Sequence, residues 1–157
     1  MANLTSFDYK MFEKARKIAK TSDFPDFKLG AVLVYKHRIL SCGANSTKTH
    51  PRQCYFNSFK NFREGSHPVR HSLHAEMSAI LSVPYLVGKD INWSKVKIYI
   101  YRISKGHPSK RGLSKPCLGC ERAIRELGIR HVYYTTDNGY AYERYIYGNN
   151  GKNNSNN

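Results

Sequence analysis

His74-Ala75-Glu76 and, further along the chain, Pro116-Cys117-Leu118-Gly119-Cys120 are the two stretches that decide the fold of this sequence. A histidine and two cysteines supply the nitrogen and sulfur donors that zinc prefers. A catalytic zinc takes three protein ligands and keeps a fourth position for water, and the ion lowers the pKa of that water towards neutrality. We therefore predict a zinc site held by His74, Cys117 and Cys120.

A carboxylate, Glu76, follows the histidine by two residues. Three ligands already complete a catalytic zinc site, so Glu76 is not needed for coordination. It is close enough to the metal to hold the bound water and to move its protons. The pattern therefore predicts a general acid–base role for Glu76.

The cysteines also allow other interpretations. A Cys-x-x-Cys pair can be redox-active, as in thioredoxin-like proteins, but the upstream His-x-Glu favours zinc. Cys42 and Cys54 are expected to be small buried residues. The alternative is a second, structural zinc that Cys42 and Cys54 form with one or more of three histidines, His50, His67 and His71.

Length and composition set the domain organisation. The 157 residues fit one domain with a core of its own, which we place at 1–147, and the Asn-rich residues 148–157 are predicted to be a disordered tail. No run approaches the roughly 20 apolar residues of a membrane span, and the first residues lack the pattern of a signal peptide. We expect a cytoplasmic protein that does not bind membranes.

The formal net charge is +15, which permits an anionic partner such as a nucleotide or a nucleic acid. Between Lys95 and Lys115 the sequence has seven basic residues and no acidic one. A single nucleotide phosphate needs two or three cations, so the excess leaves a longer anion open. A solubility role for the charge is the alternative.

Hydrophobic periodicity predicts alternating helices and strands. Helices are predicted over 6–20, 74–81, 120–127 and 140–147, and strands over 29–35, 38–44, 95–101 and 130–136. The polar segment 45–70 is predicted to be a functional loop with some packing by its aromatic residues. Strands separated by helices favour parallel pairing, with the first hairpin as an antiparallel edge. Both halves of the zinc site then lie at helix N-termini.

The combined motifs resemble the cytidine deaminase superfamily, specifically its deoxycytidylate deaminase branch. The resemblance runs from about Phe7 to Glu143 and includes the paired zinc motif and three further stretches: Gly30-Ala31-Val32-Leu33-Val34, Gly43-Ala44-Asn45 and Gly128-Ile129-Arg130-His131-Val132. It implies a three-layer α/β/α fold with a mixed sheet of about five strands. A homo-oligomer is expected from the resemblance alone.

The resemblance also implies an activity: hydrolytic deamination of a cytosine nucleotide or nucleoside by a zinc-dependent hydrolase, with deoxycytidylate (dCMP to dUMP) as the expected substrate. By the same likeness, Glu76 protonates the ring nitrogen and then the leaving amine. The Asn45 side chain contacts the sugar or base, and the backbone of Ala75 meets the base edge.

Two other classes of function remain open. The segment 45–70 differs from the short glycine-rich turn expected of a deoxycytidylate enzyme, so the substrate could instead be a base in nucleic acid, as in the tRNA adenosine deaminases. A non-catalytic module with a structural zinc is the third class, although such a site has no use for Glu76. If a terminal phosphate is recognised, its expected contacts come from His50, Arg52, Lys110, Arg111 and Lys115.

Overall fold

The computed structural model describes residues 3–58, 72–104 and 112–146. Its strands are β1 (Phe27–Tyr35), β2 (Arg38–Ala44), β3 (Ser46–Thr49), β4 (Ser72–Leu73), β5 (Lys97–Ser104), β6 (His131–Thr135) and β7 (Tyr140–Arg144). Its helices are α1 (Ser6–Ala19), α2 (Pro51–Asn57), α3 (Ala75–Leu81), α4 (Tyr85–Gly88) and α5 (Leu118–Leu127), with a 3-10 turn, η1 (Trp93–Lys95). Among these residues no helix is long and apolar enough to cross a membrane.

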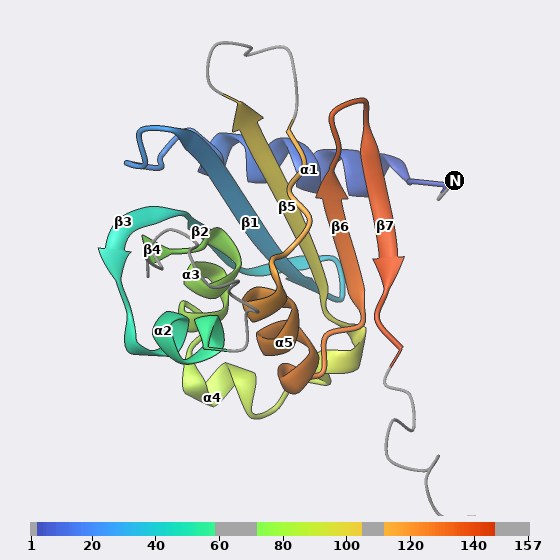
Figure 1. Cartoon of the computed structure of the whole chain (residues 1–157). Coiled ribbons are helices and arrows are strands. Elements are labelled where there is room, and N and C mark those ends of the chain that lie inside the picture. Colours follow the sequence, from blue (N-terminus) through green and yellow to red (C-terminus); the bar gives the residue numbers. More distant parts are fainter. Residues whose placement is uncertain (1–2, 59–71, 105–111, 147–157) are drawn as a thin grey trace, which may run out of the picture.

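Five strands form one sheet in the order β2-β1-β5-β6-β7, and β3 pairs with β4 separately. Figure 1 shows α1 behind the sheet and α3 and α5 in front of it. Alternate side chains of β1 face the two layers: Ala31 and Leu33 pack on the α3 and α5 side, and Val32 and Val34 on the α1 side. The predicted three-layer α/β/α fold is confirmed.

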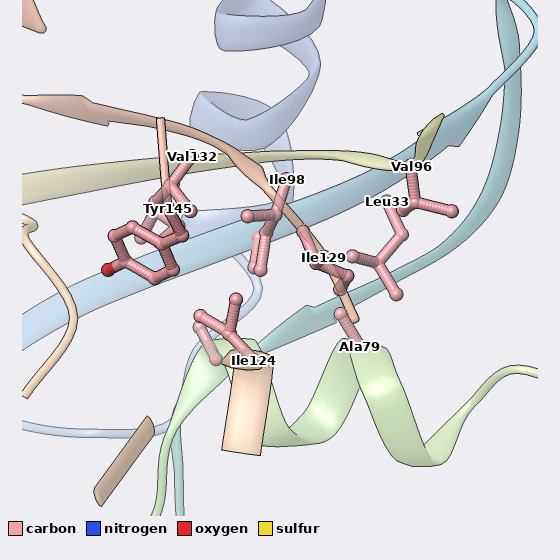
Figure 2. Packing of buried hydrophobic residues seen from close by; sticks show 11 residues of the cluster. Leu33, Ala79, Val96, Ile98, Ile124, Ile129, Val132 and Tyr145 are labelled. Carbon is pink, nitrogen blue, oxygen red and sulfur yellow. The ribbon is translucent and has the colours of Figure 1, made fainter. Parts of the chain in front are cut away.

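The core on the front face seats the two helices that carry the motifs. Figure 2 shows Ala79 of α3 and Ile124 of α5 directed towards Leu33 and Ile98 of the sheet. All four side chains are fully buried. This packing holds the N-termini of α3 and α5 against one end of the same sheet.

On the other face, α1 is anchored at its first turn. The Thr5 side chain caps the helix, and Asp8 accepts a hydrogen bond from the Thr5 backbone N–H in return. The hydroxyl of Tyr99 on β5 also donates to the Asp8 carboxylate. Reciprocal capping satisfies helix N–H groups that have no partner inside the helix, so Asp8 both starts α1 and ties it to the sheet.

The strand directions confirm part of the predicted topology and correct the rest. β5 and β6 are parallel, and β1 and β2 form the antiparallel hairpin at the edge. Direct pairing of strands that a helix separates is not found for β2 and β5, because β1 lies between them and pairs antiparallel with both. The connection from β2 to β5 contains α3. These two strands run in the same direction on opposite sides of β1, so the connection joins parallel strands that are not neighbours in the sheet.

The helix predicted over 140–147 is also wrong. Residues Tyr140–Arg144 form β7, which pairs antiparallel with β6, and Tyr147 lies outside the described residues. Aromatic side chains favour this outcome, since Tyr142 packs 4.8 Å from Tyr133 between ring centroids. The residues between the two strands include Asp137-Asn138-Gly139, and residues of these types favour the tight turn of a hairpin.

The segment 45–70 is more ordered at its start than a loop. It contains the unpredicted β3 and the helix α2, and residues 59–70 lie outside the described part of the chain, as do 148–157. The C-terminal end of α5 agrees with its prediction: Gly128 has a φ of 102° and accepts the left-handed conformation that ends the helix.

Candidate active site

The three predicted metal ligands come together in the structure. His74 Nδ1 lies 3.5 Å from Cys117 Sγ and 3.3 Å from Cys120 Sγ. Zinc bonds of roughly 2.3 Å to sulfur and 2.1 Å to nitrogen at a tetrahedral angle place S and N about 3.5 Å apart. Among the described residues, this is the group of side chains able to hold a metal. Both the donor types and their separations fit zinc.

Each half of the group includes an N-cap, the residue directly before a helix. His74 is the N-cap of α3, and Cys117 is the N-cap of α5, where its Sγ accepts from the Cys120 backbone N–H at 3.5 Å. Helix N-termini carry partial positive charge, which stabilises thiolates. Hydrogen bonds from Cys120 and His74 lower the pKa of Cys117 to about 3. The same thiol pairing, together with burial, raises the pKa of Cys120.

Glu76 lies in the first turn of α3 and is only 4% exposed. It is outside the His74, Cys117 and Cys120 group. Burial raises the pKa of the Glu76 carboxyl, because desolvation penalises its charged form, and the neighbouring His74 opposes the shift. A raised pKa brings a carboxyl closer to the pH at which an enzyme works, where proton uptake and release are most efficient.

A cavity of about 200 Å³ opens beside this cluster. His74, Cys117 and Glu76 line one side of it. Its remaining lining comes from the start of β1 and the segment before it, the residue after β2, the end of β5, the segment before α5, β4 and the first residue of α3: Phe24, Phe27, Leu29, Asn45, Ser72, Ala75, Arg102, Leu113, Ser114 and Lys115. The predicted residues Asn45, Ala75 and Lys115 therefore share a cavity with the metal ligands and Glu76.

Asn45 has a clear structural role in addition to lining the cavity. Its Oδ1 accepts from Ser22 Oγ at 2.5 Å and from the Leu29 N–H at 2.8 Å, and its Nδ2 donates to Phe27 O at 3.1 Å. One of its two amide N–H donors is taken by Phe27, and no other described residue takes the second. Asn45 therefore fixes the cavity wall and keeps a donor for a ligand.

The other predicted phosphate contacts lie elsewhere or outside the described residues. His50 is the N-cap of α2, and its Nδ1 accepts from the Arg52 N–H at 3.1 Å. Arg52 lines a different cavity, together with Trp93 and Leu127. Neither lines the cavity beside Glu76. Lys110 and Arg111 lie outside the described residues.

The two remaining cysteines are not brought together. Cys42 packs on the α1 side of the sheet, whereas Cys54 lies on α2, in front of the sheet in Figure 1. Within the described residues, neither cysteine joins a group that could bind metal. His67 and His71, the other histidines of the second-site hypothesis, lie outside those residues.

The helix α2 supplies a connection that the sequence did not reveal. Gln53 is fully buried, its Oε1 accepts from the His74 backbone N–H at 3.0 Å, and its Nε2 donates to Asn57 Oδ1 at 2.9 Å. Gly119, between the two cysteine ligands, packs against Phe56 and Asn57. This short helix therefore bridges the N-termini of α3 and α5.

We expect Gln53→Ala to weaken zinc binding by about 10- to 100-fold, the usual cost of removing a group that orients a ligand. The substitution removes the acceptor for the His74 N–H and the amide that donates to Asn57 Oδ1. Competition with a chelator of known affinity measures the loss. Arg52→Gln, on the same helix but lining the other cavity, is the matched control, and an equal loss in both variants would contradict the role of Gln53.

Several residues that line the cavity were not predicted, and two of them, Arg102 and Phe27, lie near the ends of strands. Arg102 lies near the C-terminal end of β5, and Phe27 is the first residue of β1. Ligand sites of α/β proteins often lie at strand ends, so a search of the residues that end each predicted strand could have found Arg102. Phe27 gave no such signal, since its strand was predicted to begin at Leu29.

Comparison with known proteins identifies the family. The family model for the cytidine and deoxycytidylate deaminase zinc-binding region matches residues 5–136. No curated protein sequence matches the chain significantly.

Solved structures share the fold at low sequence identity. The dCMP deaminase of cyanophage S-TIM5 in apo form has a TM-score of 0.53 and 19% identity, covering 85% of this chain and 86% of that chain. The cytidine deaminase of Burkholderia pseudomallei has a TM-score of 0.54 and 19% identity, covering 90% and 93%. The family match spans most of the sequence and includes His74, Glu76, Cys117 and Cys120. The chain is therefore a member of the cytidine and deoxycytidylate deaminase family.

Proposed function

We propose that this protein hydrolytically deaminates a cytosine nucleotide or nucleoside, with deoxycytidylate as the substrate and dUMP and ammonia as the products. The observation that carries the proposal is a buried carboxylate, Glu76, lining the same cavity as a His/Cys/Cys metal group. A related structure, the cyanophage S-TIM5 dCMP deaminase, is known in complex with dCMP and dUMP, at 20% identity and a TM-score of 0.52. The likeness to that structure supports the fold of this chain, and deoxycytidylate as its substrate is our proposal.

The proposed cofactor is one Zn²⁺, held by His74, Cys117 and Cys120. When bound, zinc lowers the pKa of a coordinated water and so supplies a nucleophile at neutral pH. The three side chains leave Glu76 outside the ligand group. This separation suits a carboxylate that moves protons and does not coordinate.

Glu76 is proposed to take a proton from the attacking water. It delivers that proton to the ring nitrogen of the base. It then takes the proton of the hydroxyl now bonded to the base carbon and passes it to the departing amine, so that the C–N bond breaks, ammonia leaves and the carbonyl forms. Its raised pKa favours this exchange.

The cavity offers contacts for one base and its sugar. Ala75 is buried in the first turn of α3, where backbone N–H groups lack partners within the helix; we propose that its backbone meets the base edge. Asn45 keeps an amide donor for the base or sugar. Phe24 and Phe27 lie 4.7 Å apart between ring centroids and provide an apolar wall for the ring.

A base within nucleic acid is the second candidate substrate. The formal charge of +15 exceeds what one monophosphate requires, and charge of this size favours binding to a phosphate backbone.

A homo-oligomeric state also remains a prediction, and its test is the mass of the purified protein in solution.

One side-by-side assay separates the candidates. Zinc-loaded protein is incubated with dCMP, cytidine, adenosine and a short single-stranded DNA, and ammonia and the deaminated base are measured. We expect dCMP to be converted with the highest kcat/KM. Activity on the single strand, without activity on the small molecules, would reject the free-nucleotide proposal. Loss of activity on all substrates with zinc bound would favour a non-catalytic module.

A further inference from the structure

Arg102, near the end of β5, is held rigidly at the cavity beside the metal group. Its guanidinium carbon lies 4.8 Å from the centroid of the Phe27 ring. A side chain at Gly112 would bring a Cβ within 2.6 Å of Arg102 Cδ and 2.8 Å of Nε. The Arg102 side chain therefore contacts both an aromatic ring and the backbone of Gly112, and a side chain at residue 112 would displace it.

Two buried hydroxyls fix the position of that glycine. Thr135 Oγ1 donates to Gly112 O at 2.7 Å and accepts from the Arg102 N–H at 3.2 Å. Ser114 Oγ donates to Ile100 O at 2.8 Å and accepts from the Thr135 N–H at 2.7 Å. Ser114 and Thr135 are 2% and 0% exposed. Strands β5 and β6 thus hold both Arg102 and the segment that packs on it.

The positive charge of Arg102 lacks an acidic partner among the described residues. The ion pairs found there involve other cations. The Arg102 Nε is buried without a hydrogen-bond partner, and Nη1 reaches Leu113 O only at 3.5 Å, the weak limit of a hydrogen bond. The neighbouring cation of the cavity, Lys115, lies 3.6 Å from Glu143. Among the residues that the structure describes, Arg102 is therefore a cation without an acidic partner, and its Nε donates to none of them.

We infer that Arg102 binds the anionic group of the substrate, the monophosphate of the nucleotide proposed above, on which this inference rests. A guanidinium presents a planar set of donors that pairs with two phosphate oxygens. Contact with the Phe27 ring holds the guanidinium at the cavity before the ligand arrives, which lowers the entropic cost of binding. Arg102, rather than His50 or Arg52, then distinguishes a nucleotide from a nucleoside.

The test is the selectivity between dCMP and deoxycytidine. The kcat/KM of each substrate is measured for the zinc-loaded wild type and for Arg102→Gln. We expect the ratio of dCMP to deoxycytidine to fall by about 10- to 100-fold, the effect of losing charge-assisted hydrogen bonds. Inorganic phosphate, used as a competitive inhibitor against deoxycytidine, is expected to show a Ki that rises in the same variant.

Arg38→Gln is the control. It removes the same charge from an exposed residue at the turn between β1 and β2, whereas Arg102 pairs with Leu29 near the opposite end of β1. It should leave the ratio of dCMP to deoxycytidine unchanged. If Arg102→Gln loses its zinc or its fold, Arg102→Lys gives the same comparison and should lower the ratio less. An unchanged ratio, or an equal fall with Arg38→Gln, overturns the assignment of Arg102 while the proposed deamination stands. Absence of turnover on both small molecules in the wild type overturns the proposed function and this inference with it.

Discussion

Glu76→Gln is expected to lower kcat for deamination by about 10²- to 10⁴-fold, the contribution typical of a general acid–base residue. Glutamine keeps the size and polarity of the side chain but cannot take up or deliver the proton. Because Glu76 lies outside the metal-binding group, the variant should keep its zinc. The measurement pairs steady-state kinetics on dCMP with metal analysis of the same preparation.

Glu126→Gln on α5 is a suitable control, because Glu126 is exposed and pairs with Arg122 on the helix surface. Its kcat should match the wild type. Near-normal turnover by Glu76→Gln would remove this carboxylate from the proton path. Loss of zinc from Glu76→Gln would instead make Glu76 a ligand or a support for one.

Cys117→Ala is expected to abolish both zinc binding and activity. Catalytic zinc sites depend on three protein ligands, and Cys117 is also the N-cap whose Sγ accepts from Cys120 N–H. The purified variant should therefore contain less than about half a zinc per chain, where the wild type contains about one. Metal analysis and thermal unfolding of both proteins, with and without added zinc, measure the effect.

The matched control for this experiment is Cys54→Ala, since Cys54 lies outside the metal-binding group. Its zinc content should equal that of the wild type. Zinc content unchanged by Cys117→Ala would reject Cys117 as a ligand, whatever its effect on activity.

The sequence could predict that His74, Cys117 and Cys120 lie together, because two short motifs set most of the geometry. His74 and Cys117 each begin a helix, and the spacing from Cys117 to Cys120 places both sulfurs within one turn. The remaining requirement was that α3 and α5 pack on the same face of the sheet, which the apolar residues Ala79 and Ile124 indicate. The three donors accordingly lie together in the structure.

Features that depend on contacts between distant segments were not predictable in this way. The direction of β1 relative to β5 follows from the placement of β2, not from any residue pattern within β5. Residues 140–144 were compatible with either a helix or a strand, and pairing with β6 decided between them. Gln53 and Arg102 acquire their roles only because α2 and the segment after Gly112 pack beside the site.

The placement of the cavity at the ends of β2 and β5 has a consequence for how this enzyme could diversify. Residues 59–71 and 105–111 rejoin the described chain at Ser72 and Gly112, next to residues that line the cavity. The five strands and the metal group belong to other parts of the chain. The part of the cavity wall that Ser72, Leu113 and Lys115 supply can therefore change during evolution while the sheet and the metal group are inherited intact.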